Sequence, residues 1–285
     1  MTIGEAEVWA NRRNQFKQAI VNGGAPIAMW SSIPWPESIE IMGRRGIDAA
    51  LVDLEHGPFD VTAVSNLARA AELWGVSPIV RLDRGNLDLA SRILDLGVQG
   101  LIFPHVESGA DATECYQATE YAPAGTRGWA GSHSRFALWE GPFAAELGEL
   151  PVDARGVYSE RYKHAAHEFL FRMFLIESPR GVANVREILA TGYADAVSFG
   201  WGDYSASVDF DLSKCDEALA EVYVAARDAG VGMELHPGHV ESGKTPWYPG
   251  CFLLAGHDSL VYSRAIGSAA DRAKEIAGRA SRGVS

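Results

Sequence analysis

The chain is poor in the features that mark several large protein classes. Its three cysteines, Cys115, Cys215 and Cys251, are odd in number and widely spaced, which fits neither a disulfide framework nor a zinc-ligand pair. No apolar run approaches the ~18 residues of a membrane-spanning helix, and the first residues lack the apolar core of a secretory signal. Neither a dinucleotide fingerprint nor a P-loop occurs. We therefore expect a cytoplasmic protein with free, buried thiols.

Positive charge is also scarce. Lys and Arg number 25 against 37 Asp and Glu, so the formal net charge is −12. Nucleic acids and anionic membranes both require a positive protein face. We therefore expect neither as a partner, which leaves small molecules and other protein chains.

Short apolar runs alternate with amphipathic stretches of helical period, such as 61–74 and 87–96. The eight apolar runs are residues 25–31, 47–54, 77–82, 98–103, 169–176, 194–199, 231–235 and 251–255. Eight strands followed by helices predict a single-domain (β/α)8 (TIM) barrel over residues 1–285, with a doubly wound sheet as the alternative. A helix over 5–21 would close the barrel bottom, and 123–168 is expected to be a long loop.

Chemically active side chains gather at the predicted carboxyl ends of these strands. They are Trp30, Glu55, His56, Arg81, Asp83, His105, Glu107, Glu177, Asp203, His236 and His257. The strand starts hold much less of this chemistry. Because a barrel enzyme builds its active site at the carboxyl ends of its strands, this asymmetry predicts a catalytic site.

Glu177 and Asp203 follow the fifth and sixth predicted strands. Either residue alone has an ordinary structural explanation, since Glu177 could cap the next helix and Asp203 lies in a Gly-flanked turn. Together, at neighbouring strand ends, the two carboxylates can share one hard cation. No Cys/His cluster competes, so Mg²⁺ or Mn²⁺ is favoured, with Co²⁺ as an alternative.

Arg81 ends an apolar strand beside His56. Arg81 either forms an ion pair with Asp53 or Glu55, or holds a planar oxyanion of a substrate. His56 is either a structural rim histidine or a group that transfers a proton. We expect His105, His236 and His257 to form the wall of the site. No Lys ends a strand, so no Schiff-base nucleophile is indicated.

The sequence resembles the HpcH/HpaI aldolases, the metal-dependent (class II) pyruvate aldolases, over about residues 20–275. The resemblance rests on motifs in the family's order. These are D-x-E-H after the second strand, an Arg ending the third, LDLGVQGLIFPHVES across the fourth, PAGTRGW, IES and G-x-x-D-x-S.

The resemblance implies roles for individual residues. Glu177 and Asp203 match the two metal ligands, His56 the general base, and Arg81 the residue that stabilises the enolate. Asp95 matches an aspartate that raises the basicity of the histidine. Since Asp95 ends a predicted helix far from the rim, this role requires a neighbouring subunit.

The turn around Gly202 and Asp203 matches the one that holds the substrate carboxylate, with Trp201 beside it. This chain departs from the family's pattern at three places. Leu175 stands where a Gln often touches the substrate, GWGDYS replaces a less bulky turn, and residues 145–168 differ. The resemblance therefore does not identify the aldehyde.

The family implies a metal-dependent carbon–carbon lyase that cleaves a 4-hydroxy-2-oxo acid into pyruvate, or a related 2-oxo acid, and an aldehyde. Three alternatives remain: an oxaloacetate-type decarboxylase, an acyl-CoA lyase, and a non-catalytic barrel that binds small acids. The family also implies a homo-oligomer, a hexamer or a trimer, whose subunits exchange a C-terminal helix, here residues 258–281.

Overall fold

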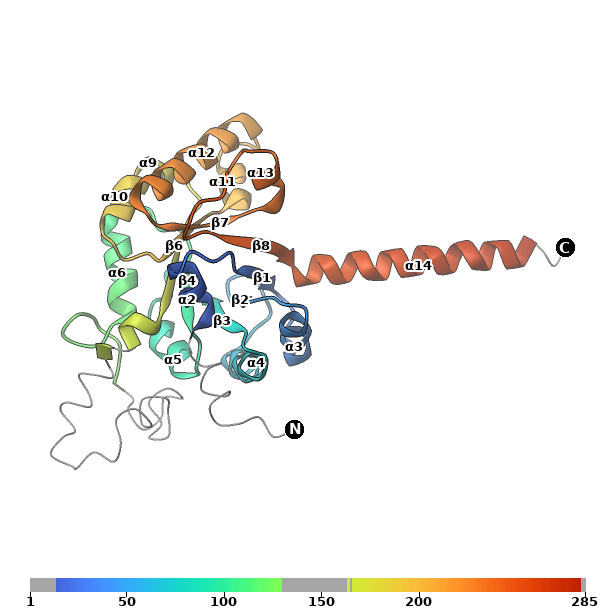
Figure 1. The fold of residues 1–285 in the computed structure, drawn as a ribbon, viewed down its shortest axis with the longest axis horizontal. Coiled ribbons are helices and arrows are strands. Elements are labelled where there is room, and N and C mark those ends of the chain that lie inside the picture. The colour runs from blue at the N-terminus through green and yellow to red at the C-terminus, as the bar shows by residue number, and fades with distance from the viewer. Residues whose placement is uncertain (1–13, 130–162, 165, 283–285) are drawn as a thin grey trace, which may run out of the picture.

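In the computed structural model, which describes residues 14–129, 163, 164 and 166–282, eight parallel strands close into a barrel in chain order (Figure 1). The strands are β1 Ile27–Ser31, β2 Ala49–Asp53, β3 Ser77–Arg81, β4 Gly100–Phe103, β5 Phe171–Ile176, β6 Ala196–Phe199, β7 Gly232–Leu235 and β8 Phe252–His257. Each lies within or overlaps one of the eight apolar runs of the sequence. The (β/α)8 prediction is confirmed, and the doubly wound alternative is excluded because β1 pairs with β8.

Helices follow the strands and surround the barrel. They are α2 Gln15–Val21, α3 Pro36–Arg44, α4 Val61–Trp74, α5 Leu89–Asp95, α6 Gly109–Thr119, α9 Pro179–Ala183, α10 Val185–Ala190, α11 Trp201–Ser207, α12 Leu212–Ala229, α13 Pro237–Glu241 and α14 Asp258–Arg282. Helix α4 has the predicted bounds because its ends are specified locally. Asp60 caps its first turn by accepting from the Ala63 amide at 2.7 Å, and Gly75 ends it in the left-handed region at φ 69°.

The barrel interior is a packed core closed at the bottom by α2. Phe16 is fully buried there, edge-on to Phe171 and Phe252 with ring centroids 5.3 and 5.0 Å away. The Asn14 side-chain amide also donates to the Gln99 carbonyl at 2.8 Å. The described part of the predicted 5–21 helix therefore closes the bottom of the barrel, which leaves the upper end for a site.

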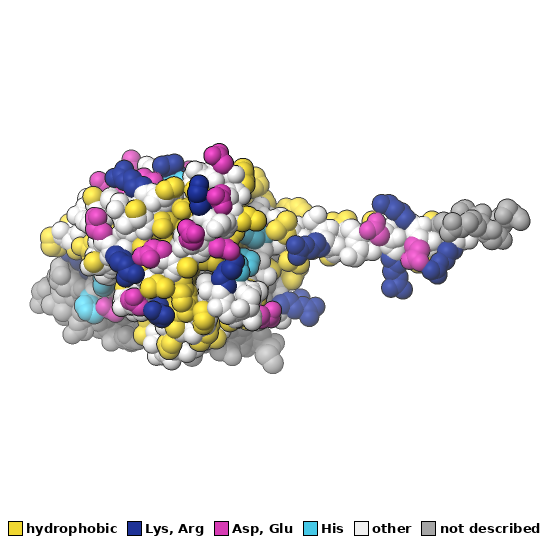
Figure 2. Space-filling view, turned by 90° about the horizontal axis from the view of Figure 1, so that it is seen from above, with side chains coloured by type: hydrophobic (Ala, Val, Ile, Leu, Met, Phe, Trp, Pro, Cys, Tyr) yellow, Lys and Arg dark blue, Asp and Glu magenta, His cyan; other side chains and the backbone are white. Residues whose placement is uncertain are grey.

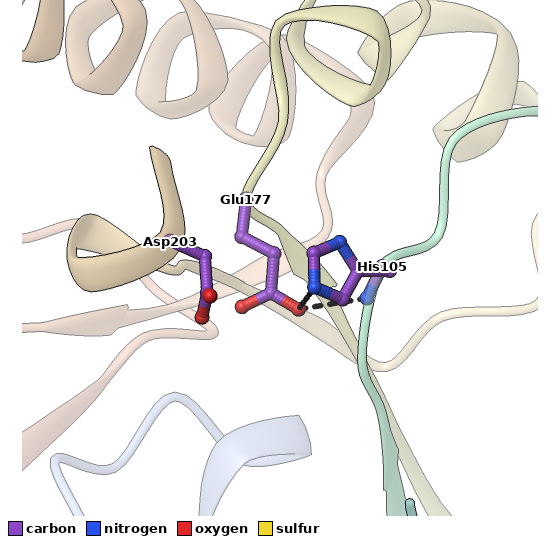
Figure 3. A group of neighbouring side chains, drawn as sticks. All are labelled: His105, Glu177 and Asp203. Carbon is purple, nitrogen blue, oxygen red and sulfur yellow. Dashed lines mark hydrogen bonds and ion pairs between the residues drawn. The ribbon is translucent and has the colours of Figure 1, made fainter. Parts of the chain in front are cut away.

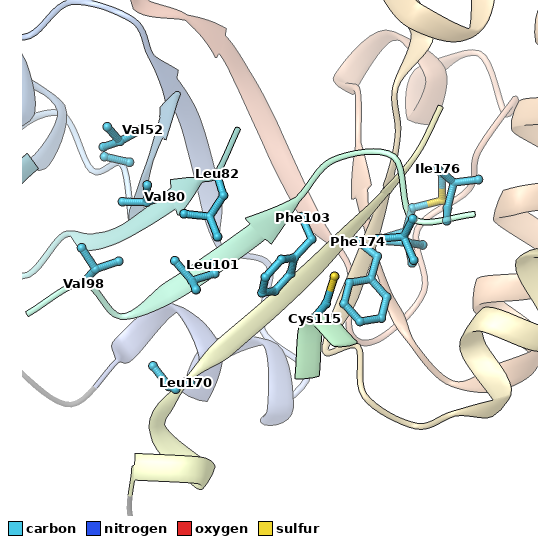
Figure 4. Close-up of a cluster of buried hydrophobic side chains, with 14 of the residues drawn as sticks. Val52, Val80, Leu82, Val98, Leu101, Phe103, Cys115, Leu170, Phe174 and Ile176 are labelled. Carbon is cyan, nitrogen blue, oxygen red and sulfur yellow. The ribbon is translucent and has the colours of Figure 1, made fainter. Parts of the chain in front are cut away.

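A second, larger core lies between the outward faces of the strands and the helices (Figure 4). Phe103 of β4 and Phe174 of β5 meet edge-on, with ring centroids 6.0 Å apart, and Cys115 of α6 lies next to both. Strand residues therefore pack on both faces, inward into the barrel and outward against helices, which explains why these strands are continuous apolar runs rather than alternating ones. All three cysteines are free and buried, as predicted.

Helix α14 leaves the barrel and extends away from it (Figure 1). Its first residue, Asp258, is held at the end of β1 by the Ser32 amide at 2.9 Å. Figure 2 shows apolar side chains on the part of α14 near the barrel and charged ones farther out; Leu260, Tyr262 and Ile266 are exposed. The predicted C-terminal helix is confirmed, while its exchange between subunits stays a prediction.

No described helix combines the length and apolarity that a membrane span would need. Of the predicted 123–168 loop, residues 130–162 and 165 lie outside the described residues. Most of the atypical 145–168 stretch lies there too.

Candidate active site

Two carboxylates and an imidazole meet at the carboxyl ends of β4, β5 and β6 (Figure 3). Glu177 directly follows β5, and Asp203 lies in the first turn of α11. The β5–β6 register places Ile176 opposite Phe199, so the residues that follow the two strands emerge side by side. The sequence prediction that Glu177 and Asp203 lie together agrees with this placement.

His105 is the third member of this group, although the sequence suggested only a wall residue. Ligand atoms of His105, Glu177 and Asp203 all lie within 4.8 Å of one another. The His105 amide donates to Glu177 Oε1 at 2.8 Å, and His105 Nε2 lies 3.6 Å from the same oxygen. A signal was present in the sequence, because His105 follows the fourth strand as Glu177 follows the fifth. Neighbouring strand ends bring such residues together.

Glu177 is almost fully buried, at 2% exposed. Burial raises its pKa to about 7, and the charges of Asp203 and Glu55 add to this effect, while the His105 amide and Arg81 oppose it. Gly200 lies so close that a β-carbon there would be 2.4 Å from Glu177 Oε2. The fold therefore fixes the buried carboxyl group of Glu177 close to the carboxylate of Asp203. A bound cation would neutralise the negative charge of these two groups.

The donor set fits a divalent cation. Glu177, Asp203 and His105 would supply two carboxylate oxygens and one imidazole nitrogen. Oxygen ligands suit Mg²⁺ and Mn²⁺, and the imidazole also suits later transition metals such as Co²⁺. Asp203 is exposed, so substrate oxygens and water can reach the same point.

Arg81 is fixed by acidic and aromatic neighbours. Its Nε and Nη2 donate to the two Asp53 oxygens at 2.8 and 2.5 Å, and Nη1 lies 3.5 Å from Glu55. The guanidinium also lies 4.9 Å from the Trp30 ring centroid. Burial raises the pKa of Asp53, but the hydrogen bonds and charge of Arg81 outweigh it, so this pKa is lowered overall. The ion pair left open by the sequence is present, and it fixes the guanidinium, whose positive charge acts on Glu177.

His56 and Asp95 are not among the side chains whose ligand atoms meet in this cluster. His56 is exposed in the turn after β2, where its amide donates to Asp53 Oδ1 at 3.2 Å. Asp95 ends α5 and forms an ion pair with Arg127 at 3.0 Å. The action of Asp95 on His56, which was expected to need a neighbouring subunit, stays a prediction.

The turn that begins α11 presents Trp201 and Gly202 next to Asp203. Trp201 is partly buried against Phe199, edge-on at 5.8 Å, and its ring lies 5.8 Å from Lys244 Nζ. Gly202 is exposed, and a β-carbon there would meet nothing within 4 Å. The first turn of α11 therefore has open space for a ligand at Gly202, and the Trp201 ring lies on one side of it.

Sequence reasoning missed Glu234, which lies within the apolar strand β7. Its Oε1 accepts from Ser198 Oγ at 3.1 Å. Burial raises its pKa to about 7, opposed by the Ser198 hydroxyl, the charge of Arg81 and the Trp30 indole. The signal was a single Glu in the run VGMEL, a residue type that is almost never buried without a partner.

Comparison with known proteins finds that the chain is similar to aldolases. It is 31% identical to a hydroxypyruvate/pyruvate aldolase of Delftia acidovorans, covering 89% of this chain and 90% of the relative. It is 26% identical to a 2-keto-3-deoxy-L-rhamnonate aldolase of Klebsiella pneumoniae, covering 89% and 90%.

A crystal structure of an HpcH/HpaI aldolase/citrate lyase family protein from Burkholderia cenocepacia has the same fold. Its TM-score is 0.75 at 24% identity, covering 92% of this chain and 99% of that one. The family model of HpcH/HpaI aldolase/citrate lyase matches residues 27–235, which include Arg81, His105, Glu177 and Asp203. The chain therefore belongs to the HpcH/HpaI aldolase/citrate lyase family.

Proposed function

We propose that this chain is a metal-dependent carbon–carbon lyase that cleaves a 4-hydroxy-2-oxo acid into pyruvate, or a related 2-oxo acid, and an aldehyde. The observation that carries the proposal is the group of His105, Glu177 and Asp203, with the charge of Arg81 acting on Glu177. Curated relatives that align over nine-tenths of their length are aldolases, which supports the same reaction class.

Glu177 and Asp203 would hold the divalent ion, Mg²⁺ or Mn²⁺ with Co²⁺ as an alternative, and His105 completes the donor set. When bound, the ion supplies a Lewis acid for the carboxylate and ketone oxygens of the 2-oxo acid. The Gly202 and Asp203 amides lie in the first turn of α11, where backbone N–H groups have no partner within the helix. They are available to the substrate carboxylate.

His56 takes the proton of the C4 hydroxyl. The C3–C4 bond then breaks, the aldehyde carbonyl forms at C4, and the bonding electron pair moves through C3 to the C2 oxygen. Arg81, held by Asp53, stabilises the negative charge that develops there. Protonation at C3 completes the 2-oxo acid. The exposure of His56 fits a site that a neighbouring subunit covers, where Asp95 of that subunit would raise its basicity.

The same proposal covers the domain organisation, the location and the oligomeric state of the protein. Residues 1–285 would form one catalytic barrel domain that acts on small molecules in the cytoplasm. Helix α14, with apolar residues exposed along it, would join subunits into a hexamer or a trimer.

Product analysis tests the proposal against its closest rival. Purified protein with Mn²⁺ should convert 4-hydroxy-2-oxopentanoate to equal amounts of pyruvate and acetaldehyde, and chelation by EDTA should stop the reaction. The same preparation should be assayed with oxaloacetate for release of CO₂. Efficient decarboxylation without any aldehyde from the hydroxy acid would replace the aldolase proposal with a decarboxylase.

A further inference from the structure

His257, the last residue of β8, stacks on the ring of Trp30 near the end of β1. The two ring centroids lie 6.1 Å apart and the ring planes differ by 11°, which is an offset parallel stack. His257 is exposed, whereas Trp30 is only 6% exposed. The imidazole therefore covers part of a buried ring from the solvent side.

A bulge in β8 places His257 on this ring. Ala28 of β1 pairs with Leu254 of β8, but Trp30 pairs with His257, so β8 contains one residue more than β1 between the two pairs. Gly256, within this stretch, has φ 125°, a conformation that residues with side chains rarely adopt. Bulges next to active sites redirect side chains in this way. Without the extra residue, Gly256 would stand opposite Trp30 and the stack would be lost.

Asp258 anchors the position that follows. Its carboxylate accepts hydrogen bonds from the Ser32 amide at 2.9 Å, the Ile33 amide at 3.2 Å and the Ser31 hydroxyl at 3.2 Å. The backbone of His257 is therefore held between a bulge and an anchored residue, and both fix it relative to β1.

The same Trp30 ring supports Arg81. The guanidinium carbon of Arg81 lies 4.9 Å from the ring centroid, and its Nε and Nη2 donate to Asp53 at 2.8 and 2.5 Å. Hydrogen bonds at the edge of the guanidinium hold it within its plane, and contact with the ring face limits its movement out of that plane. The orientation of Arg81 therefore depends on the position of Trp30.

The charge state of His257 is compatible with this support. Desolvation of the imidazole lowers the pKa of His257, and the charges of His236 and Arg81 lower it further, while Asp258 and Asp53 oppose them. A lowered pKa favours the neutral imidazole, so that no second positive charge competes with Arg81 for its carboxylate partner.

We propose that His257 is a positioning residue for the lyase reaction, which holds the Trp30 ring where that ring supports the Arg81 guanidinium. This inference rests on the proposed lyase function, in which Arg81 stabilises the negative charge on the C2 oxygen. It adds a residue that acts through Trp30 rather than on the substrate.

His257→Ala removes the stacked ring from an exposed position and should leave the core intact. Exchange of the pyruvate C3 protons in D₂O with Mg²⁺, followed by NMR, should show a kcat about fivefold lower, the size expected for the loss of one aromatic pair. KM for pyruvate, and the affinity for Mn²⁺ in a titration, should change less than twofold, because Arg81 stabilises charge that develops only in the transition state. Wild-type kcat in His257→Ala would overturn the inference.

Two further substitutions separate the stack from other effects of the side chain. His257→Phe keeps a ring and should bring kcat within twofold of the wild type, whereas His257→Asn keeps a polar group without a ring and should be as slow as His257→Ala. His167→Ala is the matched control and should exchange like the wild type. The His167 ring also lies 6.1 Å from an aromatic ring, that of Tyr116, but His167 precedes β5, whose amino end is opposite the site. Equal rates for His257→Phe and His257→Asn would contradict a role for stacking.

Coupling to Arg81 distinguishes positioning from a general structural effect. In Arg81→Lys the guanidinium that Trp30 supports is absent, so adding His257→Ala should slow exchange less than twofold further. A fivefold loss in both backgrounds would show that His257 does not act through Arg81, and it would overturn the inference.

The proposed function and the role of His257 can fail separately. Metal-dependent exchange in the wild type with no loss in His257→Ala would overturn only the role of His257. Absence of exchange in the wild type would overturn the proposed function and this inference with it.

Discussion

Replacing Gly200 with alanine should weaken metal binding without touching any ligand. A β-carbon at Gly200 would lie 2.4 Å from both Cβ and Oε2 of Glu177. The backbone there has φ −75°, which alanine adopts without strain, so the clash is the only direct effect. Such overpacking costs about 1–3 kcal/mol unless a neighbour moves. Glu177 is the neighbour that must move, and its carboxylate is half of the proposed carboxylate pair.

Displaced supporting groups at metal sites typically cost about 10–100-fold in affinity, which is the loss we expect for Mn²⁺. Titration of the apo protein with Mn²⁺, with free Mn²⁺ followed by electron paramagnetic resonance, measures it directly. Gly202→Ala is the matched control, since its β-carbon meets nothing within 4 Å, and it should bind Mn²⁺ like the wild type. Wild-type affinity in a folded Gly200→Ala protein would show that Glu177 does not hold the metal as we infer.

Three further predictions concern Arg81, Glu177 and α14. Arg81→Lys should lower kcat/KM about 10–100-fold, because an ammonium group cannot form the two parallel hydrogen bonds that Arg81 makes with Asp53. Its Mn²⁺ affinity should be unchanged. Steady-state kinetics measures kcat/KM, and Mn²⁺ titration measures the affinity. The pKa of Glu177 is raised from 4.5 to about 7 in the folded protein, so its contribution to stability is fully present below about pH 4.5 and is lost as the pH rises to 7. Glu177→Gln should therefore stabilise the apo protein by up to about 3 kcal/mol at pH 8 and by much less at pH 4 in urea unfolding; equal effects at both pH values would refute the buried charge. A chain that ends after Ser263 keeps Asp258 but loses most of α14, and it should elute as a monomer in size-exclusion chromatography, whereas the full chain should elute as an oligomer.

The fold was predictable because its signals are local. Runs such as 77–82 and 169–176 are mostly apolar on both faces, as strands buried on both sides require. Asp60 and Gly75 mark the two ends of the helix 61–74. Long-range packing contacts are not specified by any local sequence pattern. The insertion of Phe16 between Phe171 and Phe252 joins three segments that are distant in the sequence.

The site was partly predictable, since Glu177, Asp203 and Arg81 stand at strand ends where barrel chemistry gathers. His105 was assigned to the wall because its Pro-His turn looks ordinary in sequence. In the structure its backbone is left-handed, at φ 52°, and its Nε2 lies 3.6 Å from Glu177 Oε1. Glu234 was missed because a strand residue can face the helices or the interior, and the closure of the barrel decides which. The placement of Asp95 against His56 depends on a second chain, which one sequence does not specify.

Solvent exchange of the pyruvate C3 protons is the most direct test of the central claim, that a divalent ion held by Glu177 and Asp203 promotes enolate formation. Pyruvate in D₂O with the protein and Mg²⁺ should lose its methyl proton signal by NMR. EDTA should stop the loss, added Mg²⁺ should restore it, and Glu177→Ala should not support it. Exchange that continues undiminished after EDTA, or in Glu177→Ala, would contradict the account.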